Sequence, residues 1–114
     1  MLNTMKLFSA LSALALTLSL SLPAMAESEA YVIVIKNHRF EPSELTLPAN
    51  QRIKLTIHNQ DATAEEFESK DLRREKIIAG NSTASVWVGP LPAGEYGFFG
   101  EFHEETAQGK LIAK

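Results

Sequence analysis

Apolar and polar residues alternate in short runs along most of the chain after residue 30, which is the pattern of β-strands. The clearest run is Gln51–His58, where Ile53, Leu55 and Ile57 occupy every second position. These three side chains would therefore face one side of a sheet. Ala30–Lys36 is also predicted as a strand, because it is a continuous run rich in β-branched residues. Further strands are predicted at Glu44–Leu47, Glu65–Ser69, Lys76–Ala79, Ser82–Val88, Glu95–Phe99 and Gly109–Ala113.

Turn-forming residues separate the predicted strands. The segments 48–50, 80–81 and 89–94 are rich in proline, glycine and asparagine, which end strands and favour turns. No segment after residue 30 keeps a helical period over a useful length. Seven or eight short strands with such turns predict an all-β fold, a two-sheet antiparallel β-sandwich with Greek-key connections.

The first 26 residues have the features of a cleaved signal peptide. Lys6 precedes an apolar run, Leu7–Leu22, and Pro23–Ala26 supplies a helix breaker and small residues at the A-x-A positions. A membrane anchor is the alternative, but the run is short and diluted by serines. We therefore expect cleavage after Ala26, a bacterial periplasmic location, and one domain spanning residues 27–114 with no remaining membrane span.

Composition narrows the possible functions. The chain has no cysteine, which excludes disulfides, thiolate zinc sites and cysteine nucleophiles. Loss of the first 26 residues would leave 14 acidic against 10 basic side chains, which argues against a nucleic-acid partner. No nucleophilic serine motif or glycine-rich phosphate loop is present, so we do not expect an independent enzyme. Histidines and glutamates are the remaining candidates for chemistry.

Several segments together resemble the cupredoxins, and the resemblance covers nearly all of residues 27–114. They are Phe40-Glu41-Pro42, Leu45–Asn50, Leu55–Asn59, Gly89–Phe99 and Gly109–Ile112. Two more segments, Glu65–Ser69 and Phe98–His103, resemble the EfeO-type cupredoxin-like domain, particularly small periplasmic members that accompany ferrous-iron permeases. This narrower resemblance implies an inner-membrane iron permease and a periplasmic iron-binding protein as partners.

Most copper ligands of the cupredoxins are absent when the motifs are compared position by position. Glutamate replaces the first histidine, at Glu65 or Glu66, and Gly100 takes the place of the cysteine. His103 matches the second histidine, and no methionine lies at the axial position near residues 106–107. A blue-copper site requires a thiolate, so we expect no type 1 copper and no electron transfer of the usual cupredoxin kind.

Five residues are predicted to contribute to a metal site at one end of the sandwich: His38, Glu65, Glu66, Glu101 and His103. His38 and His103 are assigned by their places in the resemblance. Glu65 and Glu66 cannot both point inward from an extended strand. Position relative to the family histidine favours Glu65, whereas the EfeO-type pattern favours Glu66, the preferred candidate. Glu101 could assist His103 from the same loop.

Imidazole and carboxylate ligands suit Fe(II), Fe(III) or Cu(II) better than Cu(I). The leading hypothesis is a periplasmic module that binds iron for a high-affinity uptake permease and aids Fe(II) oxidation or transfer. A Cu(II)-binding protein or copper donor is the second hypothesis. The third is a metal-free sandwich that mediates protein contacts.

Overall fold

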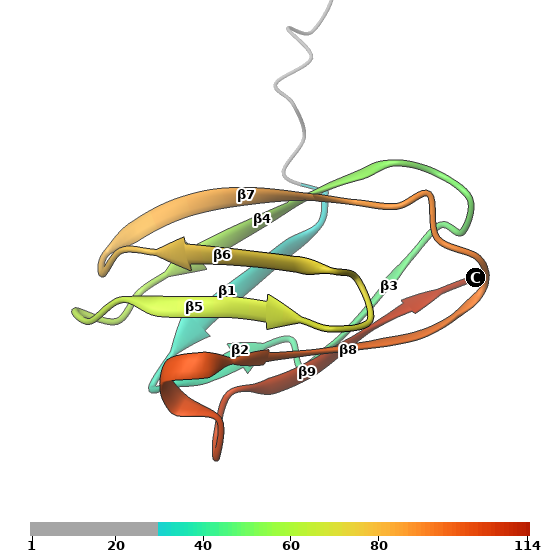
Figure 1. The fold of residues 1–114 in the computed structure, drawn as a ribbon. Helices are drawn as coiled ribbons and strands as arrows, with labels where there is room; N and C mark the ends of the chain where they lie inside the picture. Colours follow the sequence, from blue (N-terminus) through green and yellow to red (C-terminus); the bar gives the residue numbers. More distant parts are fainter. Residues whose placement is uncertain (1–29) are drawn as a thin grey trace, which may run out of the picture.

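The computed structural model describes residues 30–114, which form nine strands and one short 3₁₀ helix arranged in two packed sheets (Figure 1). The predicted signal peptide lies outside the described residues. No helix within residues 30–114 has the length and apolar character of a membrane span. The elements are β1 (Val32–Lys36), β2 (Arg39–Glu41), β3 (Glu44–Leu47), β4 (Ile53–Asn59), β5 (Glu65–Ser69), β6 (Arg74–Ile78), β7 (Ser82–Val88), β8 (Gly94–Gly100), η1 (Glu101–His103) and β9 (Gln108–Ala113).

The predicted all-β sandwich of two sheets is confirmed, but the sheets are mixed rather than purely antiparallel. One sheet has the order β2-β1-β4-β7 and the other β3-β9-β8-β5-β6. Two pairs, β1 with β4 and β3 with β9, run parallel. The cause is the short strand β2, which the sequence pattern did not reveal: the chain turns back in β2 and then crosses to the second sheet. Strands β1 and β4 thus become neighbours without a hairpin between them.

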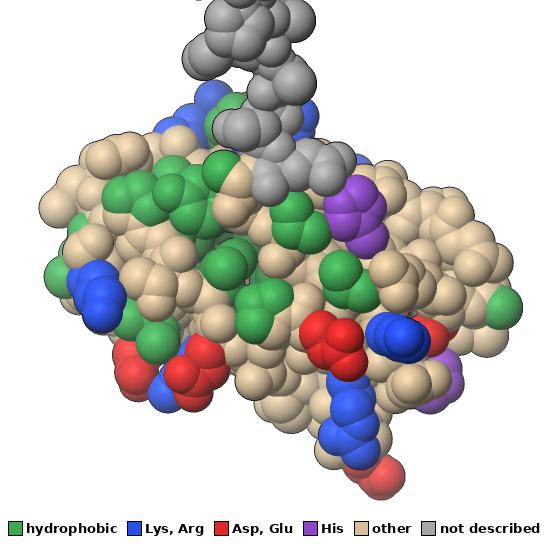
Figure 2. All heavy atoms as spheres, turned by 180° about the vertical axis from the view of Figure 1, so that it is seen from behind, with side chains coloured by type: hydrophobic (Ala, Val, Ile, Leu, Met, Phe, Trp, Pro, Cys, Tyr) green, Lys and Arg blue, Asp and Glu red, His purple; other side chains and the backbone are tan. Residues whose placement is uncertain are grey.

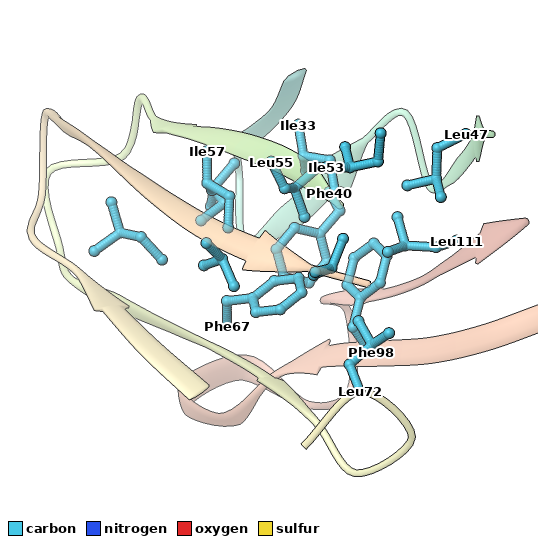
Figure 3. Packing of buried hydrophobic residues seen from close by; sticks show 14 of the residues in the cluster. Ile33, Phe40, Leu47, Ile53, Leu55, Ile57, Phe67, Leu72, Phe98 and Leu111 are labelled. Carbon is cyan, nitrogen blue, oxygen red and sulfur yellow. The ribbon is translucent and has the colours of Figure 1, made fainter. Parts of the chain in front are cut away.

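The core lies between the sheets and follows the alternation read from the sequence. Ile33 of β1 and Leu55 of β4 are completely buried on the inner face of the first sheet. Phe40 contributes from β2, and Phe67 and Phe98 come from the facing sheet (Figure 3). The Phe98 ring centroid is 4.9 Å from that of Phe40 and 5.0 Å from that of Phe67. These distances are favourable for aromatic pairs, so the three rings join the two sheets.

Gly109 on β9 lies against this aromatic group. A Cβ atom at this position would be 2.4 Å from Cζ of Phe98 and 2.9 Å from the carbonyl oxygen of Ser43. Phe98 is only 1% exposed and has no room to move away. Close packing therefore requires glycine at this position.

The outer surface of the five-stranded sheet and the adjoining η1 carry a group of four glutamates, here called the carboxylate cluster: Glu66, Glu68, Glu75 and Glu101. Glu68 of β5 lies directly opposite Glu75 of β6. Hydrogen bonding to Glu101, loss of hydration and repulsion by the other three carboxylates raise the pKa of Glu68 to about 7. Loss of hydration and the carboxylates of Glu101 and Glu75 also raise the pKa of Glu66.

On the opposite face of the molecule, acidic side chains are interspersed with lysine and arginine, and apolar side chains occupy part of the surface (Figure 2). Mixed charges of this kind largely compensate one another. Like charges that lie close together instead favour protonation or the binding of a cation.

Gly109→Ala is expected to lower the free energy of unfolding by about 1–3 kcal/mol, because the added methyl group overpacks the aromatic core. Gly97→Ala on β8 is the matched control, since a Cβ there would meet only Asp71 Oδ2 at 3.6 Å. Urea unfolding of both variants tests this. Equal stability of the two alanine variants would contradict the packing argument.

Glu68→Gln is expected to stabilise the protein at pH 8 but to have little effect near pH 4.5. The pKa of Glu68 is about 7 in the folded protein and near its ordinary value of 4.5 when unfolded. The unfolded chain therefore loses this proton first, and stability falls as the pH rises from about 4.5 to 7. Thermal unfolding in a chelating buffer across this range measures the effect.

The control is Glu104→Gln, which changes an exposed glutamate outside the cluster. An identical pH profile for the Glu104 and Glu68 variants would contradict the proposed repulsion.

Candidate metal site

Three segments that are distant in sequence meet at one end of the sandwich. His38 lies in the turn between β1 and β2, Glu65 is the first residue of β5, and His103 ends η1. Figure 1 shows this turn beside the helical segment that follows β8. One ligand atom from each of these side chains lies within 4.8 Å of the other two. Two ligand atoms bound to one ion with bonds of about 2.1 Å are at most about 4.2 Å apart. The three ligand atoms would therefore need to move only slightly to bind one ion together.

Glu65 is the buried member of this triad, with its side chain only 1% exposed. Its Oε1 accepts hydrogen bonds from the backbone N–H groups of Glu66, at 3.0 Å, and Phe102, at 2.9 Å. Its Oε2 lies 2.5 Å from Nδ1 of His103. A buried carboxylate requires such partners because loss of hydration is costly. One oxygen is thus fixed by the backbone, and the other faces the histidine.

The two imidazoles cover the solvent side of the site. The rings of His38 and His103 are stacked, with centroids 3.5 Å apart and an angle of 13° between their planes. The His38 side chain is 44% exposed and that of His103 is 28% exposed. A hydrogen bond joins Nδ1 of His103 to Oε2 of Glu65, and a cation bound by both atoms would take the place of the hydrogen between them. A cation therefore has access from the histidine side.

The backbone of His38 is held by side chains from two other loops. Oδ1 of Asp61 accepts from Asn37 N, at 2.8 Å, and Oδ2 accepts from His38 N, at 2.9 Å. The hydroxyl of Thr106 donates to the carbonyl oxygen of His38 at 2.5 Å. Partial burial tends to raise the pKa of Asp61, but the two backbone donors and the nearby His38 and His103 outweigh it and lower the pKa.

Gly100 lies directly beside Glu65. A Cβ atom at residue 100 would be 2.7 Å from Cδ of Glu65 and 2.7 Å from Cβ of Ala107. In the cupredoxin resemblance this is the position of the ligand cysteine. The carboxyl group of Glu65 thus occupies the space that a side chain at residue 100 would need, so a thiolate there and this glutamate conformer exclude each other.

Of the five predicted site residues, the structure brings His38, Glu65 and His103 together. Glu66 and Glu101 instead belong to the carboxylate cluster, where Glu66, Glu68 and Glu101 form a second group with ligand atoms within 4.8 Å. The alternation of β5 explains the division, since Glu65 shares the inner face with Phe67 while Glu66 and Glu68 point outward. The inward glutamate is thus Glu65 rather than the preferred Glu66.

Three residues near the site were not singled out as candidates from the sequence: Asp61, Thr106 and Glu68. Asp61 lies in a polar loop, where an aspartate commonly binds nearby backbone N–H groups, and this was the only available signal. Thr106 was considered only as the place of a missing methionine. Neither signal identifies His38 as the common partner, because the contacts span 23 and 68 residues.

The triad offers two imidazole nitrogens and one carboxylate oxygen. These ligands suit divalent first-row metals and provide no soft sulfur for Cu(I). The absence of cysteine from the chain rules out a type 1 copper centre. The remaining histidine, His58, lies on β4 outside both groups, with Nδ1 2.7 Å from the hydroxyl of Thr83.

Solved structures of other proteins share the two-sheet fold of this chain. Auracyanin A, described as a blue copper protein of Chloroflexus aurantiacus, superimposes with a TM-score of 0.63 and 19% identity, covering 73% of this chain and 96% of its own. Amicyanin of Paracoccus versutus gives a TM-score of 0.60 and 16% identity, covering 76% and 83%. Identities this low establish a common fold only.

A relative in sequence is the uncharacterized protein RP394 of Rickettsia prowazekii, which is 48% identical over 80 residues. The match covers 70% of this chain and 64% of that protein, slightly less than two thirds of its length. Residues 8–113 also match the family model of the cupredoxin-like domain. This match extends over most of the chain, and the two-sheet fold agrees with it. The chain therefore belongs to the cupredoxin-like domain family.

Proposed function

We propose that this protein is a periplasmic metal-binding module that binds iron and transfers it to a high-affinity uptake permease. The observation that carries the proposal is the convergence of His38, Glu65 and His103 at one end of the sandwich, with ligand atoms within 4.8 Å of one another. A soluble exported domain with an open, thiol-free site would suit the capture and transfer of an ion rather than electron transfer.

The donor set supports iron as the cargo. Two histidines and one carboxylate with open positions form the ligand set of many non-haem Fe(II) sites. Carboxylate oxygen also favours Fe(III) over Fe(II), so the site would assist oxidation when a partner supplies an electron acceptor. The EfeO-type resemblance of Glu65–Ser69 and Phe98–His103 suggests the partners, an inner-membrane iron permease and a periplasmic iron-binding protein.

Acidic side chains around the site would attract cations. Glu101, Glu104 and Glu105 line the same open depression as His38 and His103. The carboxylate cluster continues the negative surface onto β5 and β6, through Glu66, Glu68 and Glu75. Clustered charge of one sign raises the local concentration of ions of the other sign. This arrangement supports a role in capturing cations.

Cu(II) is the second candidate. Auracyanin A, which shares the fold, is described as a blue copper protein, and one of the similar amicyanin structures is of a Cu(I) form. Cu(II) also binds nitrogen and oxygen ligands more tightly than Fe(II) in general, so selection in the cell would depend on metal supply. A Cu(II) site here would be an ordinary nitrogen and oxygen site with no thiolate band in its visible spectrum.

Anaerobic titration with Fe(II), and parallel titrations with Cu(II) and Mn(II), test the proposal. The His38→Ala/His103→Ala variant and Glu65→Gln are each expected to bind every metal at least about 10–100-fold more weakly than the wild-type protein does. Loss of an outer-shell partner alone has an effect of this size, and these variants remove ligands. His58→Ala is the matched control because this third histidine lies outside the triad.

Wild-type protein that binds no metal more tightly than the double histidine variant would end the proposal and favour a protein-interaction role. Tight binding of Cu(II) combined with no measurable binding of Fe(II) would favour the copper alternative.

Gly100→Ala is expected to weaken metal binding about 10-fold or more, because the new methyl group displaces a carboxylate that the backbone of η1 anchors. Overpacking should also lower the free energy of unfolding by about 1–3 kcal/mol. Affinity is measured well below the melting temperature so that both effects are resolved. Gly97→Ala on the same strand is the control, and unchanged affinity in Gly100→Ala would show that Glu65 need not keep this position.

A further inference from the structure

The turn that carries His38 is a two-residue hairpin loop between β1 and β2. Asn37 has φ of 53° and His38 has φ of 57°, so two consecutive non-glycine residues are left-handed. Both residues have positive φ in a type I′ hairpin turn, a conformation that asparagine and histidine adopt more often than most other side chains do. Contacts that hold the backbone of this turn therefore also fix the direction of the His38 imidazole.

Asp61 provides the first constraint. Its two carboxylate oxygens accept the consecutive N–H groups of Asn37 and His38, at 2.8 and 2.9 Å. Bonds from backbone N–H groups to a charged acceptor are stronger than those between neutral groups. Oδ2 of Asp61 also lies 3.4 Å from Nδ1 of His38, so the same carboxylate faces the imidazole ring.

Thr106 provides the second constraint. Its hydroxyl donates to the carbonyl oxygen of His38, so both hydrogen-bonding groups of this residue's backbone are bound by side chains from elsewhere. Thr106 is also tied to the site directly, because its backbone N–H donates to the carbonyl oxygen of His103 at 3.1 Å. Asp61 in turn lies in the loop that leads into Glu65. The loops of all three triad members therefore meet at His38.

We propose that Asp61 and Thr106 are the positioning residues of the metal site, which hold His38 against His103 in the conformation that binds the ion. This inference rests on the proposed metal binding. Neither residue is assigned as a ligand: each acts through the backbone of His38, and Asp61 also faces the imidazole ring. Such outer-shell partners orient a ligand histidine.

The test uses cobalt(II) chloride alone as the probe, with affinity followed by its visible absorption. Asp61→Asn and Thr106→Val are each expected to weaken cobalt binding about 10–100-fold. The asparagine keeps the size of Asp61 but cannot accept both N–H groups equally well, and the valine removes only the hydroxyl. Asp71→Asn is the matched control, because Asp71 also accepts a backbone N–H, from Gly97 at 2.9 Å, and lies outside both groups of potential ligands.

A double-mutant cycle separates positioning from general stability. In a His38→Ala background, Asp61→Asn and Thr106→Val should no longer reduce cobalt affinity, since the ligand that they position is absent. The same reduction with and without His38, or no reduction in either background, would overturn the proposal. Thr106→Val keeps the cycle informative if the Asp61 variant does not fold.

Amide hydrogen exchange of the metal-free wild-type protein tests the clamp independently of metal binding. The N–H groups of Asn37 and His38 are expected to exchange at least about 10-fold more slowly than the unconstrained chain, although they lie in an exposed turn. Unprotected amides would overturn the positioning role even if metal binds. Protected amides together with no cobalt binding would leave the clamp intact and contradict the proposed function alone.

Discussion

The burial of one carboxylate, that of Glu65, determines the arrangement of this end of the molecule. With its side chain 1% exposed, it requires hydrogen bonds, and it obtains them from two backbone N–H groups and from His103. The donor from Phe102 fixes the start of η1, and the bond to His103 fixes the end of the same element. Gly100 must lack a side chain to leave space for the carboxyl group. The position of the helical turn, the glycine before it and the orientation of one imidazole all depend on satisfying this single buried group.

The site differs from a blue-copper centre in its chemistry although the fold is shared. A side chain at residue 100 and the present carboxylate would compete for the same space, so the glutamate at residue 65 in β5 depends on the glycine at residue 100 in β8. The side chains that meet at this end of the sandwich offer nitrogen and oxygen atoms and no sulfur. Hard oxygen and borderline nitrogen favour divalent and trivalent ions. The same sandwich fold can thus carry different sets of ligand side chains at this end.

Much of the fold could be predicted from the sequence, because strand alternation and turn residues are local signals. Strand β2 and the two parallel pairs could not, since a three-residue strand has no measurable period and pairing between distant strands depends on where the chain crosses between sheets. For the site, the parity of β5 indicated that only one of Glu65 and Glu66 faces inward. The parity that Glu65 shares with Phe67 favoured Glu65, whereas the EfeO-type pattern favoured Glu66, which was wrong about the inward side chain. The contacts of Asp61 and Thr106 with His38 depend on backbone conformation in three loops, which residue types alone do not encode.

The carboxylate and the imidazoles of the triad are attached to the fold in different ways. Glu65 lies on the same face of β5 as Phe67, two residues along, and therefore belongs to the rigid framework of the aromatic core. His38 and His103 lie instead in a turn and at the end of a three-residue helix. Glu65 is consequently held by the packed core, whereas the two imidazoles are held by hydrogen bonds between loops. Hydrogen bonds between loops yield more readily than a packed core, so the histidine side of the proposed site would adjust to cations of different radius.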